Sequence, residues 1–131
     1  MRVVLDTSAY SHLRSGRKEV VDHIAGAEVV YLPTIVLGEL EAAFRLGRRA
    51  ADNRSKLEEF LDEDFVGVLP VTSDVARRYG ALFAQLRVSG TPIPVNDIWI
   101  AAATIDAGAH LVTFDRDFER VATLERTLLS P

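Results

Sequence analysis

The sequence predicts a three-layer α/β sandwich, in which a mostly parallel central sheet of four to five strands has helices on both faces. Short apolar runs without polar alternation, of which Val3–Leu5 is the first, are typical of strands buried on both faces. Segments with apolar residues at helical spacing separate these runs, as expected for parallel strands joined by helical crossovers. Two of the runs end abruptly in acids, which places polar side chains at the carboxyl edge of the sheet.

Length and composition set bounds on the class of protein. With 131 residues, 48% hydrophobic and 26% charged, the chain is expected to form a single globular domain over residues 1–131. No stretch approaches the roughly 20 apolar residues of a membrane span, and a strand that begins at residue 2 leaves no room for a signal peptide, so a cytoplasmic protein is expected. The absence of cysteine excludes disulfides and thiolate metal sites. A net charge of −4 argues against binding nucleic acid by bulk charge alone but leaves a local site open.

The expected strands are short apolar runs that end at turn or polar residues. They lie at residues 2–5, 29–32, 65–69 and 111–113, with a short edge strand within 123–128. The expected helices lie between them at residues 9–13 and 18–25, from the cap Thr34 to residue 46, at about 48–62, from residue 73 or 74 to 86, and at 97–105.

Two of these helices matter most for the site. Thr34 is the expected cap of the helix after Pro33, whose apolar stripe consists of Val36, Leu40, Ala43 and Phe44, and Glu39 lies one position off that stripe. The helix at 97–105 is apolar nearly all round and should be buried. Two prolines in the preceding loop, residues 90–94, restrict its backbone and deliver Asn96 and Asp97 to the helix start.

Acidic residues occur where this fold brings them towards one edge of the sheet. Asp6 follows the first strand, Asp115 and Asp117 follow the fourth, and Asp97 and Glu39 lie near helix starts. Each has a structural explanation when it is taken alone. Asp6 and Asp97 suit helix starts, Glu39 suits a solvated surface, and Asp115 or Asp117 suits a turn.

Taken together, clustered carboxylates would repel one another unless a cation lay among them. Oxygen-only clusters suit Mg²⁺ or Mn²⁺ and fit enzymes that cleave phosphodiesters. Four polar residues at the same edge are candidates for positioning water or substrate: Thr7, Ser8, Asn96 and Thr113.

Other chemistries have less support. The glycines form neither GxGxxG nor GxxxxGK[ST], and no serine stands in a GxSxG turn. His12, His23 and His110 lie in unrelated contexts. The basic residues that cluster in the middle of the chain form either a solvated helical face or a rim that guides RNA. They are Arg45, Arg48, Arg49, Arg54 and Lys56.

Four segments, in this order and spacing, resemble the PIN-domain ribonucleases and, within them, the VapC-type toxins of bacterial type II toxin–antitoxin pairs. They are residues 5–8 (Leu-Asp-Thr-Ser), 38–40 (Gly-Glu-Leu), 92–102 (Pro-Ile-Pro-Val-Asn-Asp-Ile-Trp-Ile-Ala-Ala) and 111–118 (Leu-Val-Thr-Phe-Asp-Arg-Asp-Phe). The resemblance spans nearly the whole chain. It implies a PIN fold, Mg²⁺- or Mn²⁺-dependent cleavage of RNA, a homodimer, and a small antitoxin whose tail blocks the groove.

By position, Asp6, Glu39, Asp97 and Asp115 match the acidic quartet of the family, with Asp117 as an alternative for the fourth place. On this hypothesis Asp6, Asp97 and Asp115 hold Mg²⁺, Glu39 binds a second ion or positions water, and the products carry 5′-phosphates and 3′-hydroxyls. Residues 122–124, Ala-Thr-Leu, replace the Pro-Gly-Leu turn typical of the family, so the course of the last strand stays open.

Two rivals remain. The first is an RNA-binding or assembly module that keeps the PIN fold without activity. The presence of all four acids argues against this alternative. The second is a phosphoryl-transfer enzyme with Asp6 as nucleophile. The chain lacks the second acid of the Asp-x-Asp that such phosphatases carry, because residue 8 is serine.

Overall fold

The computed structural model describes all residues, 1–131, and has one five-stranded sheet. The strands are β1 (Arg2–Leu5), β2 (Val29–Pro33), β3 (Val66–Leu69), β4 (His110–Thr113) and β5 (Arg126–Leu128). Their spatial order is β3-β2-β1-β4-β5, and every pair is parallel. The predicted α/β class with a parallel central sheet is therefore confirmed.

Strand β1 lies at the centre of the sheet, and its apolar run explains why. Val3, Val4 and Leu5 are all buried, as expected for a strand covered on both faces. Val3 pairs with Val30 of β2 on one side and with His110 of β4 on the other. Because β1 and β4 are neighbours in parallel, residues 6 and 114 leave the sheet at the same edge.

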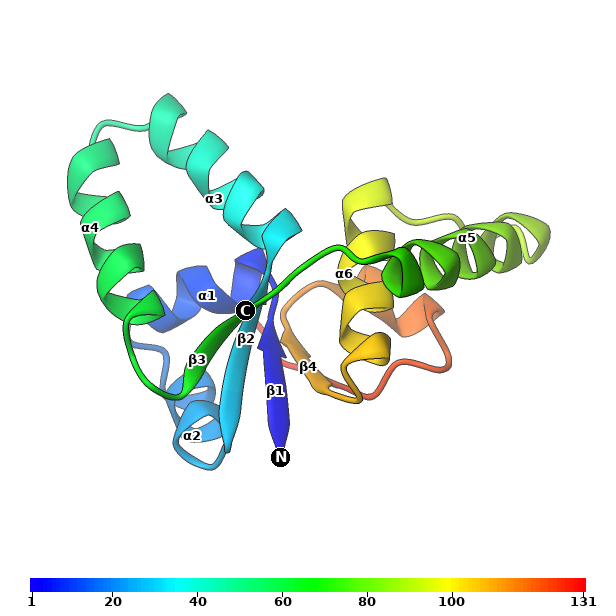
Figure 1. Cartoon of the computed structure of the whole chain (residues 1–131), viewed down its shortest axis with the longest axis horizontal. Helices are drawn as coiled ribbons and strands as arrows, with labels where there is room; N and C mark the ends of the chain where they lie inside the picture. The colour runs from blue at the N-terminus through cyan, green and yellow to red at the C-terminus, as the bar shows by residue number, and fades with distance from the viewer.

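Six α-helices and one 3₁₀-helix connect the strands. They are α1 (Thr7–Arg14), α2 (Lys18–Ala25), α3 (Thr34–Leu46), α4 (Ala50–Leu61), α5 (Ser73–Val88), α6 (Val95–Asp106) and the 3₁₀-helix η1 (Arg116–Arg120). Helices α1 to α4 lie on one side of the sheet, and α5 and α6 pack together on the other (Figure 1). None of the helices is both long enough and apolar enough to cross a membrane.

Helix α3 differs in two details from its prediction. Thr34 is not the cap but the first helical residue, and its hydroxyl donates to the Leu69 carbonyl 3.0 Å away, which joins the start of α3 to the end of β3. Ala43 is exposed, so the buried stripe consists of Val36, Leu40 and Phe44 alone. Helix α3 contacts β2, α1, α4 and α6, and Ala43 lies outside the face that these contacts bury.

Helix α6 is buried as its composition predicts. Ile98, Ile100 and residues 101–104 are all buried. The helix begins at Val95, two residues before the predicted start, and Pro94 occupies the N-cap position without a side-chain hydrogen bond. This places Asp97 in the first turn rather than at the cap.

The end of the chain resolves the course left open by residues 122–124. Strand β5 runs parallel to β4 at the sheet edge, with Thr113 opposite Leu128. The predicted short edge strand is confirmed, although it is limited to three residues. Buried Val121 and Leu124 anchor the connection before it.

Candidate active site

The predicted acids meet at the carboxyl edge of the sheet. Asp6 follows β1, Asp115 lies two residues after β4, Glu39 lies on α3 and Asp97 on α6. Residues from all four places line one cleft with a volume of about 310 Å³. Its lining consists of Asp6, Thr7, Ser8, Ser11, Glu39, Asp97, Ile100 and Asp115.

Asp6 is the most enclosed of these acids, with 4% of its surface exposed. Its Oδ1 accepts hydrogen bonds from the Ala9 amide and the Ser8 hydroxyl, both at 2.8 Å, and its Oδ2 accepts one from the Thr113 hydroxyl. Burial raises the pKa of the Asp6 carboxyl, and these hydrogen bonds oppose the rise. Asp6 therefore does cap α1, as its structural explanation requires, and it also faces the cleft.

Glu39 is tied to the cleft by two polar residues of the predicted set. The Thr7 hydroxyl donates to Glu39 Oε1 at 2.6 Å, and the Asn96 side-chain amide donates to Oε2 at 3.4 Å. The two donors come from α1 and α6, so Glu39 bridges the two walls of the cleft. A half-buried, bonded position of this kind is not that of a solvated surface residue.

Asp97 lies among several other acids. One carboxylate oxygen each from Asp97, Asp115 and Asp117 lies within 4.8 Å of the others. Burial, and after it the charges of Asp115, Glu39, Asp6 and Asp117, raise the pKa of Asp97 to about 7. Burial is the largest cause of this raised pKa, and the four acids that add to it show that negative charge is crowded where a cation would be stabilised.

The loop after β4 brings two acids to this cluster. Asp115 caps η1 by accepting a hydrogen bond from the Asp117 amide at 2.9 Å, and Asp115 is the one that lines the cleft. Asp117 lies in the first turn of η1, within reach of Asp97. The structure therefore brings both alternatives for the fourth acid to the cluster, with Asp115 nearer to the cleft.

The donor set fits a hard divalent cation. The cluster offers carboxylate oxygens, and no histidine or cysteine belongs to it. Mg²⁺ and Mn²⁺ prefer such oxygen ligands, whereas zinc sites are usually built with nitrogen or sulfur.

Sequence reasoning missed one residue near the site. The imidazole of His12 stacks on the Phe114 ring, with centroids 3.8 Å apart, and its Nδ1 lies 2.9 Å from the Ser8 carbonyl. No local signal marks this contact, because its two rings are about a hundred residues apart in sequence. The other two histidines lie elsewhere. His110 bonds to Thr127, and burial lowers its pKa, while His23 lines a surface pocket with Glu19 and Asp22.

The basic cluster on α3 and α4 is in part a set of ion pairs. Arg45 and Arg54 both bind Glu41, at 3.0 and 2.7 Å, and Lys56 pairs with Asp52 at 3.2 Å. Arg48 and Arg49 form no ion pair and lie at the exposed turn between the two helices. The cluster therefore matches a solvated helical face for three of its members.

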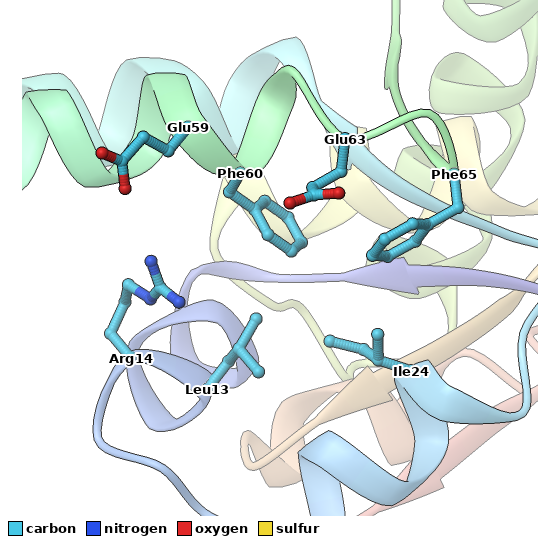
Figure 2. A pocket seen from close by; sticks show the side chains of 7 residues that line it. All are labelled: Leu13, Arg14, Ile24, Glu59, Phe60, Glu63 and Phe65. Carbon is cyan, nitrogen blue, oxygen red and sulfur yellow. The ribbon is translucent and has the colours of Figure 1, made fainter.

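A second pocket lies away from the acids, between α1, α2 and the end of α4 (Figure 2). Its volume is about 350 Å³, and four of its seven lining residues are hydrophobic: Leu13, Ile24, Phe60 and Phe65. Figure 2 places Arg14 near Glu59 at one end of it. This lining does not suit a cation, so the acidic cleft is the candidate active site.

Comparison with known proteins identifies the family of the chain. Residues 3–124 match the PIN domain family. The chain belongs to the PIN-domain family. Relatives in sequence include ribonuclease VapC5 of Mycobacterium tuberculosis, 35% identical over 88% of this chain and 84% of its own length. VapC ribonuclease Y4jK of Sinorhizobium fredii is 33% identical over 86% of each chain.

Solved structures of VapBC proteins share the fold. A structure of VapBC2 from Rickettsia felis bound to a promoter DNA fragment superposes with a TM-score of 0.87 at 24% identity, covering 99% of this chain and 100% of that one. VapBC-5 from Mycobacterium tuberculosis superposes with a TM-score of 0.77 at 26% identity over 98% of both chains. The predicted PIN fold is confirmed.

Proposed function

We propose that this PIN domain is a metal-dependent endoribonuclease of the VapC type, which hydrolyses RNA phosphodiester bonds. The observation that carries the proposal is the convergence of Asp6, Glu39, Asp97 and Asp115 on one cleft. Relatives that align over most of the chain are named VapC ribonucleases. We further propose that residues 1–131 act as a single domain.

The acids divide into two roles in this proposal. Asp6, Asp97 and Asp115 hold Mg²⁺ or Mn²⁺, with Asp117 as a nearby fourth oxygen donor. When it is bound, a divalent cation supplies Lewis-acid chemistry that makes water nucleophilic and stabilises charge on the phosphate. Glu39 orients the attacking water or contributes to a second ion.

The polar residues around Glu39 support its proposed role in orienting the attacking water. Thr7 donates to one oxygen of Glu39, and the more distant Asn96 donates to the other. These contacts fix the carboxylate while leaving acceptor directions free for the proton of a water molecule. The buried wall formed by Ile100 limits access of bulk water on one side of the cleft.

We propose a small protein antitoxin as the partner that blocks this cleft, with the toxin acting as a homodimer in the cytoplasm. The support is that several structurally similar proteins were solved as VapBC toxin–antitoxin complexes, those of Rickettsia felis and Mycobacterium tuberculosis among them. Co-expression with the reading frame beside the gene, followed by purification through a tag on one chain, tests the pairing. Recovery of this chain alone would contradict it.

Cleavage of a structured RNA tests the enzymatic proposal. We expect cleavage with millimolar Mg²⁺ or Mn²⁺, none with EDTA, and recovery when the cation is restored. The new ends should carry 5′-phosphates, which ligation of an adaptor detects. Persistence in EDTA would contradict the metal role, 2′,3′-cyclic ends would direct attention to the histidines, and RNA binding without cleavage would favour an inactive PIN module.

A further inference from the structure

Two hydroxyl groups connect the start of α1 to the loop that follows β4. The Ser8 hydroxyl donates to Asp6 Oδ1 at 2.8 Å and accepts the Phe114 amide at 3.1 Å. The Thr113 hydroxyl donates to Asp6 Oδ2 and accepts the Asp115 amide at 2.9 Å. Each hydroxyl therefore donates its proton to Asp6 and accepts an amide of the segment that follows β4, that of Phe114 for Ser8 and that of Asp115 for Thr113.

This arrangement leaves neither hydroxyl a proton to donate to a substrate phosphate. A hydroxyl group has one proton, and each of these protons is committed to Asp6. Thr113 is also fully buried, so it cannot reach a phosphate in the cleft. The positions of these protons therefore favour a role through Asp6 over direct donation to a substrate phosphate.

Counting the acceptor directions of Asp6 shows what remains free. Two oxygens offer about four lone-pair directions in total. Oδ1 uses two, for Ser8 and the Ala9 amide, whereas Oδ2 uses one, for Thr113. One direction on Oδ2 is left, so Asp6 can bind a cation through this single oxygen.

The same two segments are also held by packing. The His12 ring stacks on the Phe114 ring with an interplanar angle of 20°. In the hydrogen bond between His12 Nδ1 and the Ser8 carbonyl, the imidazole N–H is the donor, because a carbonyl oxygen only accepts. Arg17 lies over the Phe114 ring, 5.2 Å from its centroid. The loop that carries Asp115 is thus packed, through Phe114, against His12 of α1 and against Arg17, which precedes α2.

We propose that Ser8 and Thr113 are positioning residues, a pair of hydroxyl bridges that set the separation of Asp6 and Asp115 and direct Asp6 Oδ2 towards the cation. This inference rests on the proposed function in taking both acids as cation ligands. Outer residues that orient a ligand typically change metal affinity 10- to 100-fold when removed.

Matched variants separate this role from a merely structural one. Thr113→Val removes the hydroxyl at nearly constant volume, Thr113→Ser keeps it, and Ser8→Ala removes the second bridge. Thr104→Val is the control, because Thr104 is equally buried and its hydroxyl donates to a main-chain carbonyl, that of Ile100, instead of an acid. The full-length chain is titrated with Mn²⁺ alone by calorimetry, its melting temperature is measured in EDTA, and single-turnover RNA cleavage is followed at saturating Mn²⁺.

We expect Thr113→Val and Ser8→Ala to weaken Mn²⁺ binding about 10- to 100-fold. Thr113→Ser should bind close to wild type, and Thr104→Val should melt lower with unchanged Mn²⁺ affinity. Equal affinities of Thr113→Val and wild type would overturn the inference, as would equal losses in Thr113→Ser and Thr113→Val. If Thr113→Val fails to fold, Ser8→Ala decides by the same comparison.

The affinity measurement also separates this inference from the proposed function. A wild-type protein that binds Mn²⁺ yet cleaves no RNA would contradict the ribonuclease proposal alone, while the ranking of the variants would still support the hydroxyl bridges. A wild-type protein that binds no Mn²⁺ would overturn the inference itself.

Discussion

Asp6 and Asp97 lie in the same cleft but are held in opposite ways. Asp6 is almost fully buried and accepts three hydrogen bonds from the protein, which oppose the effect of burial on its pKa. Asp97 is half-buried, and burial and four neighbouring acids raise its pKa with no hydrogen bond to lower it. The first acid is fixed by the fold, whereas the second carries charge that the fold leaves uncompensated.

The difference indicates that the two acids contribute different properties to the cation site: a fixed ligand at Asp6 and uncompensated negative charge at Asp97. Donors around Asp6 fix its direction at the cost of acceptor capacity, since only one direction on Oδ2 stays open. Around Asp97, crowded charge disfavours the metal-free fold and favours whatever cation relieves it. Substitution at the two positions should therefore have different consequences.

The largest expected effect is on activity when Asp6 is replaced. Asp6→Asn keeps the shape but exchanges an anionic oxygen for an amide, so RNA cleavage should fall by at least about 100-fold. Expression of the wild type should arrest bacterial growth, and the variant should relieve the arrest while accumulating to the same level. Asp52→Asn is the matched control, because Asp52 pairs with Lys56 on exposed α4. An equally toxic Asp6→Asn would place the activity elsewhere.

A smaller difference should separate Asp115, which caps η1, from Asp117, which lies in its first turn. Asp115 lines the cleft and caps η1, whereas Asp117 contributes an oxygen only to the cluster with Asp97. Asp115→Asn should therefore lower single-turnover cleavage more than Asp117→Asn, with the second within about 10-fold of wild type if it acts only as an outer residue. The reverse order would give Asp117 the fourth place in the quartet.

Much of the site was accessible from the sequence because its acids follow local patterns. Strand β1 ends directly before Asp6, β4 ends two residues before Asp115, and two prolines mark the approach to Asp97. The hydrogen-bonded connections were not accessible. Thr113 and Asp6 are 107 residues apart in sequence, so nothing local indicates that the hydroxyl of one binds the other.

The fold shows the same division. Buried strands were predictable from composition, but the position of β1 between β2 and β4 depends on pairing over long separations. The 3₁₀-helix η1 was missed because five residues are too few for a periodic pattern. Thr34 was assigned as a cap from its residue type, whereas a tertiary hydrogen bond to Leu69 takes up its hydroxyl.

The metal-free stability of Asp97→Asn gives the smallest effect and the sharpest test of the comparison. The pKa of Asp97 is about 7 in the fold against an unfolded value of about 4. A carboxyl group with a raised pKa costs nothing below the unfolded value, where both states are protonated, and it destabilises the fold increasingly as pH rises from about 4 to about 7. Asparagine has no such dependence on pH.

At pH 7.5 in EDTA, Asp97→Asn should therefore be more stable than wild type, by on the order of 1 kcal/mol because partial exposure screens the charges. The difference should shrink towards pH 4. If Asp97 acted only as an acid at a helix start, the variant would instead lose about 0.3–1 kcal/mol.

Saturating Mg²⁺ should raise the melting temperature of wild type well above that of the variant, because only the folded site binds the ion. Urea unfolding at several pH values, with EDTA and with Mg²⁺, distinguishes the two explanations of Asp97, because they predict opposite signs for the change in the free energy of unfolding. If the variant were less stable than wild type in EDTA, and if Mg²⁺ raised both melting temperatures equally, Asp97 would not belong to a common cation site with the neighbouring acids.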